Sequence, residues 1–558
     1  MACSKLFSGD LPELTNEIIQ YFRRDFSTLY SCILVNRLWC RLAIPLLWEN
    51  PFSNHYKNCR NFQKFHYVEI YLHYLNDDYK GKFDNHKIKI NYLNTSNTLF
   101  NYPSFIKCLN TYEIAQSILK RFDPKFKLIR YTSFQSTLQL IYISLFEIFI
   151  ENEANLHTFG IQIFDCIYLD CFNHAFELIL QNPNFICNIR NLKVRINKKI
   201  ADVTKIGLFL SFLSSNCNSI STIDFEFREI NNIGKFSSLI YNSQRNLKKI
   251  SFHSNDFPLY HSLLSLKNSN CSNTLKTLAF YNINFKNIVI LKEVFDHLNV
   301  LESIHIINCY FINSEFIQQI FNLNNPFKLR SLFIDKVCEI EVEPLRLLIQ
   351  MSNEYLENFS MVISDGFNLH LLEQIKKFCP KIKFLKLCEL NKSQNIFLLF
   401  DIIKNIGENL NYITISSSTS RHSSLILQGL GQIIPSKLEY LNLSITIVAS
   451  DFELFLKNSH NTFIKTLLIR NSHKTEYCYD RLTFNQWIPQ PDVCEQDILL
   501  YLEKYIVEKK RVEYLAYNDS RDLIASKDIV KKFESYNIKV RNYYDLIVYY
   551  YNYIEKNY

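Results

Sequence analysis

The sequence predicts an α/β solenoid, a curved stack of strand–helix units of about 27 residues each. Three observations lead to this prediction: a short apolar pattern recurs along the chain, its spacing is nearly constant, and the intervening segments have helical periodicity. The chain has 558 residues, of which 47% are apolar and 21% charged. This balance is typical of a folded protein, and the length is sufficient for a long repeat array.

The recurring pattern is apolar-x-x-apolar-x-apolar, which we call the triple. Successive triples begin 26 to 28 residues apart, and looser units begin at Leu156, Ile189 and Val512. The alternation at the end of each triple is typical of a strand with one buried face. The ten regular triples begin at Ile220, Leu247, Leu275, Leu301, Leu329, Leu356, Ile382, Leu410, Leu438 and Ile464.

The segments between the triples have apolar residues three and four positions apart, as an amphipathic helix requires. Pro344 stands where a first helical turn tolerates proline, and Pro380 follows a helix that it could end. One strand and one helix per unit predict a solenoid with strands on the concave side and helices on the convex side. The expected helices are 291–298, 343–350, 370–378, 396–406 and 451–457.

The repeat is similar to a leucine-rich repeat, whose period is about 20 to 29 residues. That family also has Asn or Cys three residues past the triple. Asn255 and Cys309 fit this position, whereas most other units lack it, so the chain resembles a divergent member. We interpret Cys309 as a buried structural cysteine rather than a reactive thiol.

We assign residues 151–535 to the solenoid, with an insertion at about 473–497 that is either a binding loop or a tolerated excursion. Residues 53–150 contain no clear triple and are expected to form a mainly helical connector. This region includes an apolar helix over 138–150. The Tyr-rich residues 536–558 are expected to form a C-terminal cap.

The first 52 residues are expected to form three short helices. Pro12 begins a helix that runs to about Phe22, Asp25 or Ser27 is a candidate N-cap for a second helix through Trp39, and Pro45 is a candidate start for a third. About fifty residues are marginal for an independent core. The segment has more apolar positions than three short helices can bury, so we expect an exposed apolar surface that binds a partner.

Four motifs in this segment resemble an F-box: the Leu11-Pro12 opening, a Glu-Ile-Ile-x-Tyr-Phe helix, Leu-Val-x-Arg-x-Trp, and the Pro-Leu-Leu-Trp ending. The layout is similar to that of fungal F-box proteins with C-terminal leucine-rich repeats, although Asn36 stands where Cys is usual. The resemblance implies binding to the Skp-type adaptor of a cullin–RING ubiquitin ligase. The matching positions are Leu11, Pro12, Ile18, Ile19, Phe22, Leu29, Leu34, Val35, Trp39, Leu47 and Trp48.

Some of these residues would contact the adaptor, and the others would hold the helices together. We expect Leu11 and Pro12 to be contacts because they precede the first helix, and Trp39 to be in the core. The resemblance as a whole implies the substrate-recognition subunit of an SCF-type (Skp–cullin–F-box) ligase, in which the solenoid binds a target protein for ubiquitination. The alternative is a leucine-rich interaction scaffold without a ligase role.

Neither catalytic residues nor a cofactor or metal site is expected. The nine glycines form no G-x-G-x-x-G or G-x-x-x-x-G-K-[ST] sequence, which phosphate-binding loops need. The sequence also lacks C-x-x-C, H-E-x-x-H and G-x-S-x-G. We therefore expect a non-catalytic receptor, with an enzyme as a third and weaker alternative.

The charge and cysteine patterns predict an intracellular protein, cytoplasmic or nuclear or both. The net charge of +8 is dispersed without a basic cluster, so we expect no nucleic-acid partner. We expect no membrane span because we find no run of about 20 apolar residues. The N-terminus has no apolar signal core. The sixteen cysteines are scattered, which favours free, buried thiols in a reducing compartment.

The concave face of the solenoid is the expected target site. The third and fifth positions of each triple point to this face, and parallel strands lie about 4.8 Å apart. Three aromatic third positions in successive units, Phe384, Tyr412 and Tyr440, should form a ladder of rings. Exposed aromatic residues often dominate binding energy, but such a ladder could also simply stabilise the sheet. The predicted target-binding residues are Phe333, Phe384, Lys386, Tyr412, Tyr440 and Asn442.

Overall fold

The computed structural model describes most of the chain, in two compact units that we treat separately. Unit 1 is Met1–Lys276 with His297–Val300, and unit 2 is Thr277–Asp296 with Leu301–Tyr558. The described residues are 11–23, 25–53, 67–75, 81, 83, 99–122, 132–196, 204–227, 240–254, 257–324, 328–334, 341–363, 369–459, 461–462, 464–471, 495–509, 512–518, 527–549, 553–554 and 557–558.

Unit 1 begins with three helices, α2 (Pro12–Tyr21), α3 (Phe26–Ile33) and α4 (Arg37–Leu47). Of the two candidate N-caps, Asp25 is the one used: its carboxylate accepts a hydrogen bond from the Thr28 N–H at 3.1 Å and so caps α3.

The expected boundary between the second and third helices is wrong. The second helix ends at Ile33 instead of running through Trp39, and Pro45 lies inside α4 instead of opening it. The reason is Asn36, whose side-chain oxygen accepts a hydrogen bond from the Trp39 N–H at 2.9 Å. This N-cap starts a new helix at Arg37 within an apolar run that reads as continuous.

The rest of unit 1 alternates helices with five parallel strands whose order in the sheet is their order in the chain. Its strands are β1 (Cys108–Asn110), β2 (Thr158–Ile163), β3 (Asn191–Ile196), β4 (Thr222–Phe227) and β5 (Lys249–His253). Its further helices are α5 (Tyr67–Leu72), α7 (Thr111–Phe122), α8 (Thr132–Glu151), α9 (Cys166–Gln181), α10 (Thr204–Asn216) and α12 (Leu259–Lys267).

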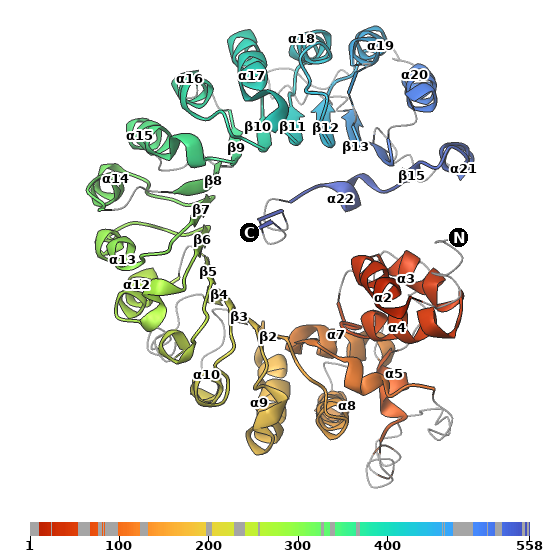
Figure 1. Ribbon diagram of the computed structural model, residues 1–558, viewed down its shortest axis with the longest axis vertical. Helices are drawn as coiled ribbons and strands as arrows, with labels where there is room; N and C mark the ends of the chain where they lie inside the picture. The colour runs from red at the N-terminus through yellow and green to blue at the C-terminus, as the bar shows by residue number, and fades with distance from the viewer. Residues whose placement is uncertain are drawn as a thin grey trace, which may run out of the picture. The chain divides into compact units, whose positions relative to one another are not determined.

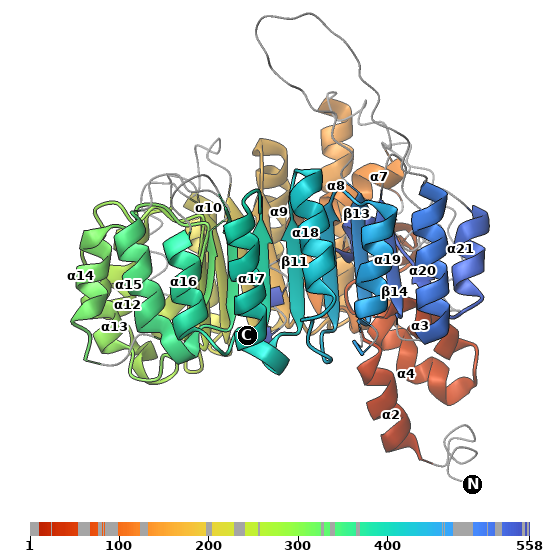
Figure 2. The ribbon, with the colours of Figure 1, turned by 90° about the horizontal axis from the view of Figure 1, so that it is seen from above.

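Unit 2 has the same alternation in two layers, with its helices on one side of the parallel strands except for the short α22, which lies on the other side (Figure 1). Figure 2 shows α16 to α19 side by side in the helical layer. The strands are β6 (Thr277–Tyr281), β7 (Ser303–Ile307), β8 (Leu329–Ile334), β9 (Asn358–Val362), β10 (Phe384–Cys388), β11 (Tyr412–Ser416), β12 (Tyr440–Ile445), β13 (Thr466–Asn471), β14 (Tyr514–Asn518) and β15 (Lys539–Val540). The helices are α13 (Leu291–His297), α14 (Ser314–Phe321), α15 (Val342–Ser352), α16 (Leu369–Phe378), α17 (Ser393–Ile406), α18 (Ser420–Leu430), α19 (Ala449–Asn458), α20 (Glu495–Lys509), α21 (Lys527–Glu534) and α22 (Tyr543–Leu546).

The prediction of strand–helix units is confirmed. Each regular triple forms one strand, and the three looser units form β2, β3 and β14. The apolar positions of a triple lie in the core: Leu410, Ile413 and Ile415 of the β11 unit are all fully buried. The five expected helices correspond to α13, α15, α16, α17 and α19, and the helix expected over 138–150 lies in α8. The core of each unit therefore lies between its strands and helices.

None of the helices in the described ranges is both long and apolar enough to cross a lipid bilayer. The predicted insertion at 473–497 lies almost entirely outside the described residues, which resume at the start of α20.

Candidate functional site

The third and fifth positions of the unit 2 triples form a surface that we call the strand face. Phe384, Tyr412 and Tyr440 are direct register neighbours on β10, β11 and β12. Their ring centroids lie 6.1 Å and 5.6 Å apart, and Phe333 on β8 lies 5.6 Å from Phe384. The predicted aromatic ladder is therefore present.

The expectation that this ladder is exposed is wrong. Phe384 is only 2% exposed, and Phe333, Tyr440 and Asn442 are equally buried, while Lys386 and Tyr412 are half-buried. The covering residues come from the end of the chain, residues 542–558, which we call the C-terminal segment. After β15, the described residues of this segment, 542–549, 553–554 and 557–558, lie along the strand face (Figure 1). The role of the ladder in target binding stays a prediction.

The segment's first anchor is Tyr543, at the start of α22. Its ring packs in a cluster with Tyr440, Leu468 and Ala516. Its hydroxyl donates a hydrogen bond to the side-chain oxygen of Asn442 at 2.8 Å. Burial raises the pKa of Tyr543 to about 12, so the hydroxyl keeps its proton and remains a donor.

The Tyr440 hydroxyl also holds the backbone of the segment. It accepts a hydrogen bond from the Val548 N–H at 3.2 Å and donates one to the Leu546 carbonyl at 3.3 Å. Tyr440 was expected to contact a target protein, but in the structure its hydroxyl binds two residues of its own chain.

The second anchor is the pair Tyr553 and Ile554, both of which are buried. The Tyr553 ring lies 4.9 Å from Phe384 and 5.0 Å from Tyr412 between centroids. The pair belongs to one buried apolar cluster with five side chains of the strand face, namely Ala279, Tyr281, Ile307, Phe333 and Phe384.

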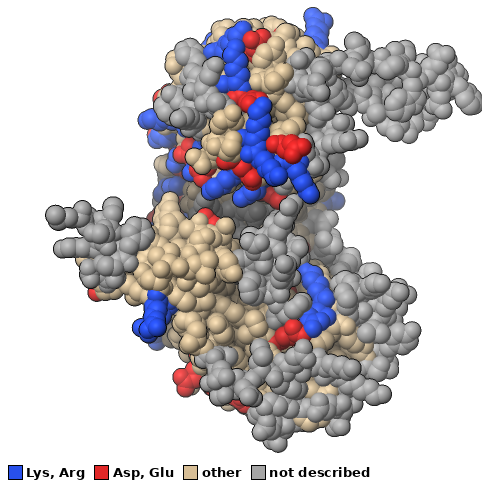
Figure 3. All heavy atoms as spheres, turned by 90° about the vertical axis from the view of Figure 1, so that its right-hand side faces the viewer, with Lys and Arg blue, Asp and Glu red and all other residues tan. Residues whose placement is uncertain are grey.

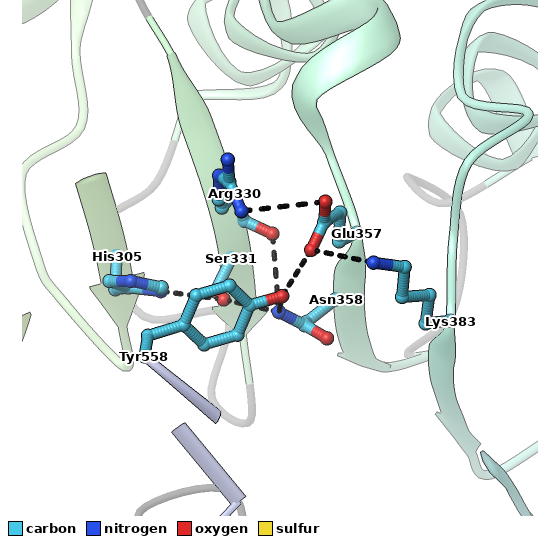
Figure 4. Close-up of polar contacts among 7 residues, drawn as sticks. All are labelled: His305, Arg330, Ser331, Glu357, Asn358, Lys383 and Tyr558. Carbon is cyan, nitrogen blue, oxygen red and sulfur yellow. Dashed lines mark hydrogen bonds and ion pairs between the residues drawn. The ribbon is translucent and has the colours of Figure 1, made fainter. Parts of the chain in front are cut away.

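The third anchor is Tyr558, which lies over β8 and β9 (Figure 4). Its hydroxyl donates a hydrogen bond to the Glu357 carboxylate and accepts one from the Asn358 amide at 3.2 Å. Glu357 also forms ion pairs with Arg330 at 3.6 Å and Lys383 at 3.3 Å. Burial and the adjacent carboxylate raise the pKa of Tyr558 above its ordinary range, so the hydroxyl remains a donor.

Beneath Tyr558, a polar network extends across three strands (Figure 4). Ser331 Oγ lies 2.7 Å from His305 Nδ1 and accepts a hydrogen bond from the Asn358 amide at 2.8 Å. All three residues are fully buried. Because a buried polar group is costly without a partner, the Asn358 amide favours an occupant that supplies a hydrogen-bond acceptor at this point, as the Tyr558 hydroxyl does.

A second candidate surface is on the three N-terminal helices of unit 1. Leu34 is 76% exposed, although its neighbours in the chain include buried core residues. The large apolar residues of this region that are more than a third exposed are Leu11, Leu14, Tyr21, Tyr30, Leu34 and Val35. Such a concentration on about 25 consecutive residues is typical of a protein interaction site.

The eleven residues predicted to bind an adaptor fall into three groups. Leu11, Pro12, Leu34 and Val35 are exposed, Ile18 and Phe22 are half-buried, and Ile19, Leu29, Trp39, Leu47 and Trp48 are buried. The core position expected for Trp39 is confirmed. Trp48 packs on Tyr71 and Tyr102, at 5.4 Å and 4.2 Å between ring centroids.

The prediction omitted three exposed residues of this surface, Leu14, Tyr21 and Tyr30. A signal for two of them was available, because Leu14, Ile18 and Tyr21 are spaced by four and three residues and so share one side of α2.

Unit 1 also contains a buried ionic cluster that the sequence reading missed. His253 Nε2 on β5 lies 2.7 Å from one Asp224 oxygen on β4, and Arg195 on β3 lies 3.6 Å from the other. Arg195 also pairs with Glu226 at 3.4 Å. Burial alone would raise the Asp224 pKa, but the charge and hydrogen bond of His253 outweigh burial and lower it well below its ordinary value. The sequence signal that could have revealed this cluster is the presence of opposite charges at matching positions of adjacent units.

Charged residues at the end of unit 2 are also paired. Glu513 forms ion pairs with Lys465 at 3.2 Å and Lys539 at 3.5 Å, and Lys532 pairs with Glu503 at 2.7 Å. Figure 3 shows basic and acidic side chains intermingled on the face that carries this end. Pairing of this kind neutralises the lysines locally.

The cysteines that the structure describes are free, as expected. Cys309 is buried, as interpreted from its position, and its thiol lies 3.4 Å from the Phe280 carbonyl. The expectation of burial is wrong for Cys166, which lies exposed in the first turn of α9, and only partly met by Cys40, Cys108, Cys187 and Cys388, which are half-buried.

Iodoacetamide at about pH 8 is expected to modify Cys166 and to leave Cys171, Cys309 and Cys379 largely unmodified in the folded chain. The reason is that the thiolate is the reactive form. Burial raises the pKa of these three thiols to about 12. Peptide mass spectrometry over a time course measures the four rates, and the urea-unfolded chain is the control. Equal rates for Cys309 and Cys166 in the folded chain would contradict the prediction.

Within the described residues, no group of three or more His, Cys, Asp or Glu side chains is arranged to hold a metal ion. The chain matches no protein-family model, and a search of curated proteins finds no similar sequence.

Proposed function

We propose that this protein is the substrate-recognition subunit of an SCF-type E3 ubiquitin ligase. In this proposal the helices α2 to α4 bind a Skp-type adaptor and, through it, a cullin–RING assembly. The solenoid binds the target protein. The protein performs no bond chemistry itself but raises the effective concentration of target lysines near the ubiquitin-conjugating enzyme.

The observation that carries the proposal is the exposed apolar surface of α2 to α4. Leu34 and Val35 lie on the turn between α3 and α4, where they have little of their own chain to contact. Their burial against a partner would remove apolar area from water, which stabilises a complex. The motifs that resemble an F-box indicate which kind of partner binds here, a Skp-type adaptor. Four of the motif positions are also exposed, namely Leu11, Pro12, Leu34 and Val35.

The test is co-purification of the full chain with a Skp-type adaptor, followed by an affinity measurement. The double variant Leu34→Asp, Val35→Asp is expected to weaken binding by about tenfold or more, because it replaces two exposed apolar side chains of this surface by charged ones. The matched control is Val289→Asp, since Val289 is 66% exposed but distant from these helices in the chain. This control should bind like the wild type.

Two outcomes would count against the proposal. Unchanged affinity of the double variant would show that this surface does not bind the adaptor. Absence of binding by a folded wild-type chain would leave the alternative, a leucine-rich interaction scaffold without a ligase role. Thermal unfolding followed by circular dichroism confirms that each variant is folded.

A further inference from the structure

The strand face of unit 2 already holds an extended segment of its own chain. Three tyrosines of the C-terminal segment, Tyr543, Tyr553 and Tyr558, occupy three places along β6 to β14. Between the first two anchors the segment is more open, with Tyr544 and Tyr549 about half exposed. Between these two exposed side chains, the Tyr440 hydroxyl holds the backbone at Leu546 and Val548, so anchored and exposed residues alternate within the described part of the segment.

We propose that the strand face is a binding groove for extended, tyrosine-containing protein segments, and that residues 542–558 are its resident ligand. A partner segment of the same chemistry enters the groove by displacing the resident one. The inference deepens the proposed function and rests on it only in identifying the partner as the ubiquitination target. The groove and its exchange are defined by unit 2 alone.

The position of the core supports the exchange of the resident segment for a partner segment. The apolar positions of each triple, such as Leu385 and Leu387 of β10, lie between the strands and the helices and are fully buried there. The C-terminal segment packs against the opposite side of the strands, on the third and fifth positions. Release of the segment would uncover the aromatic ladder, but the layer that joins strands to helices would remain.

The polar partners of the segment define which occupants fit. Asn442 accepts a hydrogen bond from the Tyr543 hydroxyl, and Glu357 accepts one from the Tyr558 hydroxyl. A phenylalanine at either place would fill the same space. At the first place it would leave the buried Asn442 oxygen without its donor, and at the second it would leave the Glu357 carboxylate with only its ion pairs to Arg330 and Lys383. A site of this kind rejects the analogue that lacks the hydroxyl. We therefore expect selection of tyrosine over phenylalanine at both ends of the partner segment.

The aromatic ladder selects the middle of the occupant. Tyr553 lies against Phe384 and Tyr412, and Ile554 is fully buried beside it. An aromatic residue followed by an aliphatic one satisfies this part of the groove. The partner segment thus has three features in order: a tyrosine, an aromatic–aliphatic pair about ten residues later, and a second tyrosine about four residues after that pair.

The test uses the full chain with a specific protease site inserted between Arg541 and Asn542. The protein is folded, cleaved at that site and mixed with a fluorescein-labelled peptide that has the sequence of residues 542–558. Fluorescence anisotropy measures binding. The labelled peptide should replace the resident segment in the cleaved protein. It should bind the uncleaved protein at least about tenfold more weakly, because the tethered segment has a high effective concentration.

Peptide variants test the recognition itself. Tyr543→Phe and Tyr558→Phe peptides are each expected to bind about tenfold more weakly than the parent peptide. The matched control is the Tyr544→Phe peptide, because Tyr544 is 51% exposed and follows the first anchor directly. This control should bind like the parent.

Three results would overturn the proposal. The first is a cleaved protein that stays folded but never exchanges its segment, which would make residues 542–558 a fixed part of the fold. The second is loss of the circular dichroism signal of the strands on cleavage. The third is equal binding of all four peptides. Failure here is separable from failure of the proposed function, because the Tyr543→Phe full chain leaves α2 to α4 intact and should still bind the adaptor.

Discussion

Replacement of Phe384 by alanine is expected to lower the free energy of unfolding of unit 2 by about 3 to 5 kcal/mol. The Phe384 ring is at the centre of the strand face, with Phe333 at 5.6 Å, Tyr412 at 6.1 Å and Tyr553 at 4.9 Å between centroids. Truncation removes these contacts and leaves a cavity that strands on both sides cannot fill without moving.

Urea unfolding followed by circular dichroism measures this loss as a shift of the transition midpoint. The matched control is Phe397→Ala, the same change at a residue of α17 that is 55% exposed, and it should cost less than about 1 kcal/mol. Equal shifts for the two variants would mean that the strand face is open to solvent, contrary to the structure.

Replacement of Asp224 by asparagine is expected to destabilise unit 1 by about 3 kcal/mol near neutral pH. The change removes the carboxylate that faces both His253 and Arg195, and thereby leaves a buried cluster without its central anion. The control is Glu226→Gln, because Glu226 pairs with the same Arg195 but its side chain is 34% exposed. Loss of that more solvated pair should cost less than about 1 kcal/mol.

The destabilisation should depend on pH in a defined direction. The folded-state pKa of Asp224 is lower than its ordinary value of about 3.9, so the carboxylate stabilises the fold at pH values above that range. The stabilisation is lost as the pH falls below about 4 toward the folded-state pKa. The difference in urea midpoint between wild type and Asp224→Asn should therefore shrink from pH 6 to pH 3. A constant difference would mean that the negative charge of Asp224 does not stabilise the fold.

The repeat could be predicted from the sequence because it depends on local spacing. Except for β8, which begins at the first position of its triple, the strands of the regular triples begin at the third position, so a nearly constant period of 26 to 28 residues also sets the register, as for Tyr412 and Tyr440. The first strand escaped detection for a specific reason. Its unit reads Ile106, Leu109 and Thr111, and the buried Thr111 replaces the third apolar residue of the triple.

The covering of the strand face could not be predicted in the same way. The partner of Asn442 is Tyr543, and the partner of Glu357 is Tyr558, 101 and 201 residues away in the sequence. Apolar alternation shows which side of a strand points away from the helices but does not show what packs on that side. The tyrosines of residues 536–558 were visible as a composition bias, whereas their partners are set by tertiary structure.

These long-range contacts also change how unit 2 should lose its structure. In an array whose strands follow chain order, each unit contacts only its neighbours, so the terminal units can fray independently. The contacts of Tyr543 and Tyr558 bridge units that are far apart in this order, and they couple the fraying of β14 to that of β8 and β9. During synthesis, the aromatic ladder stays uncovered until residues 542–558 have left the ribosome. Unit 2 should therefore reach its full folding cooperativity only after those residues have been made.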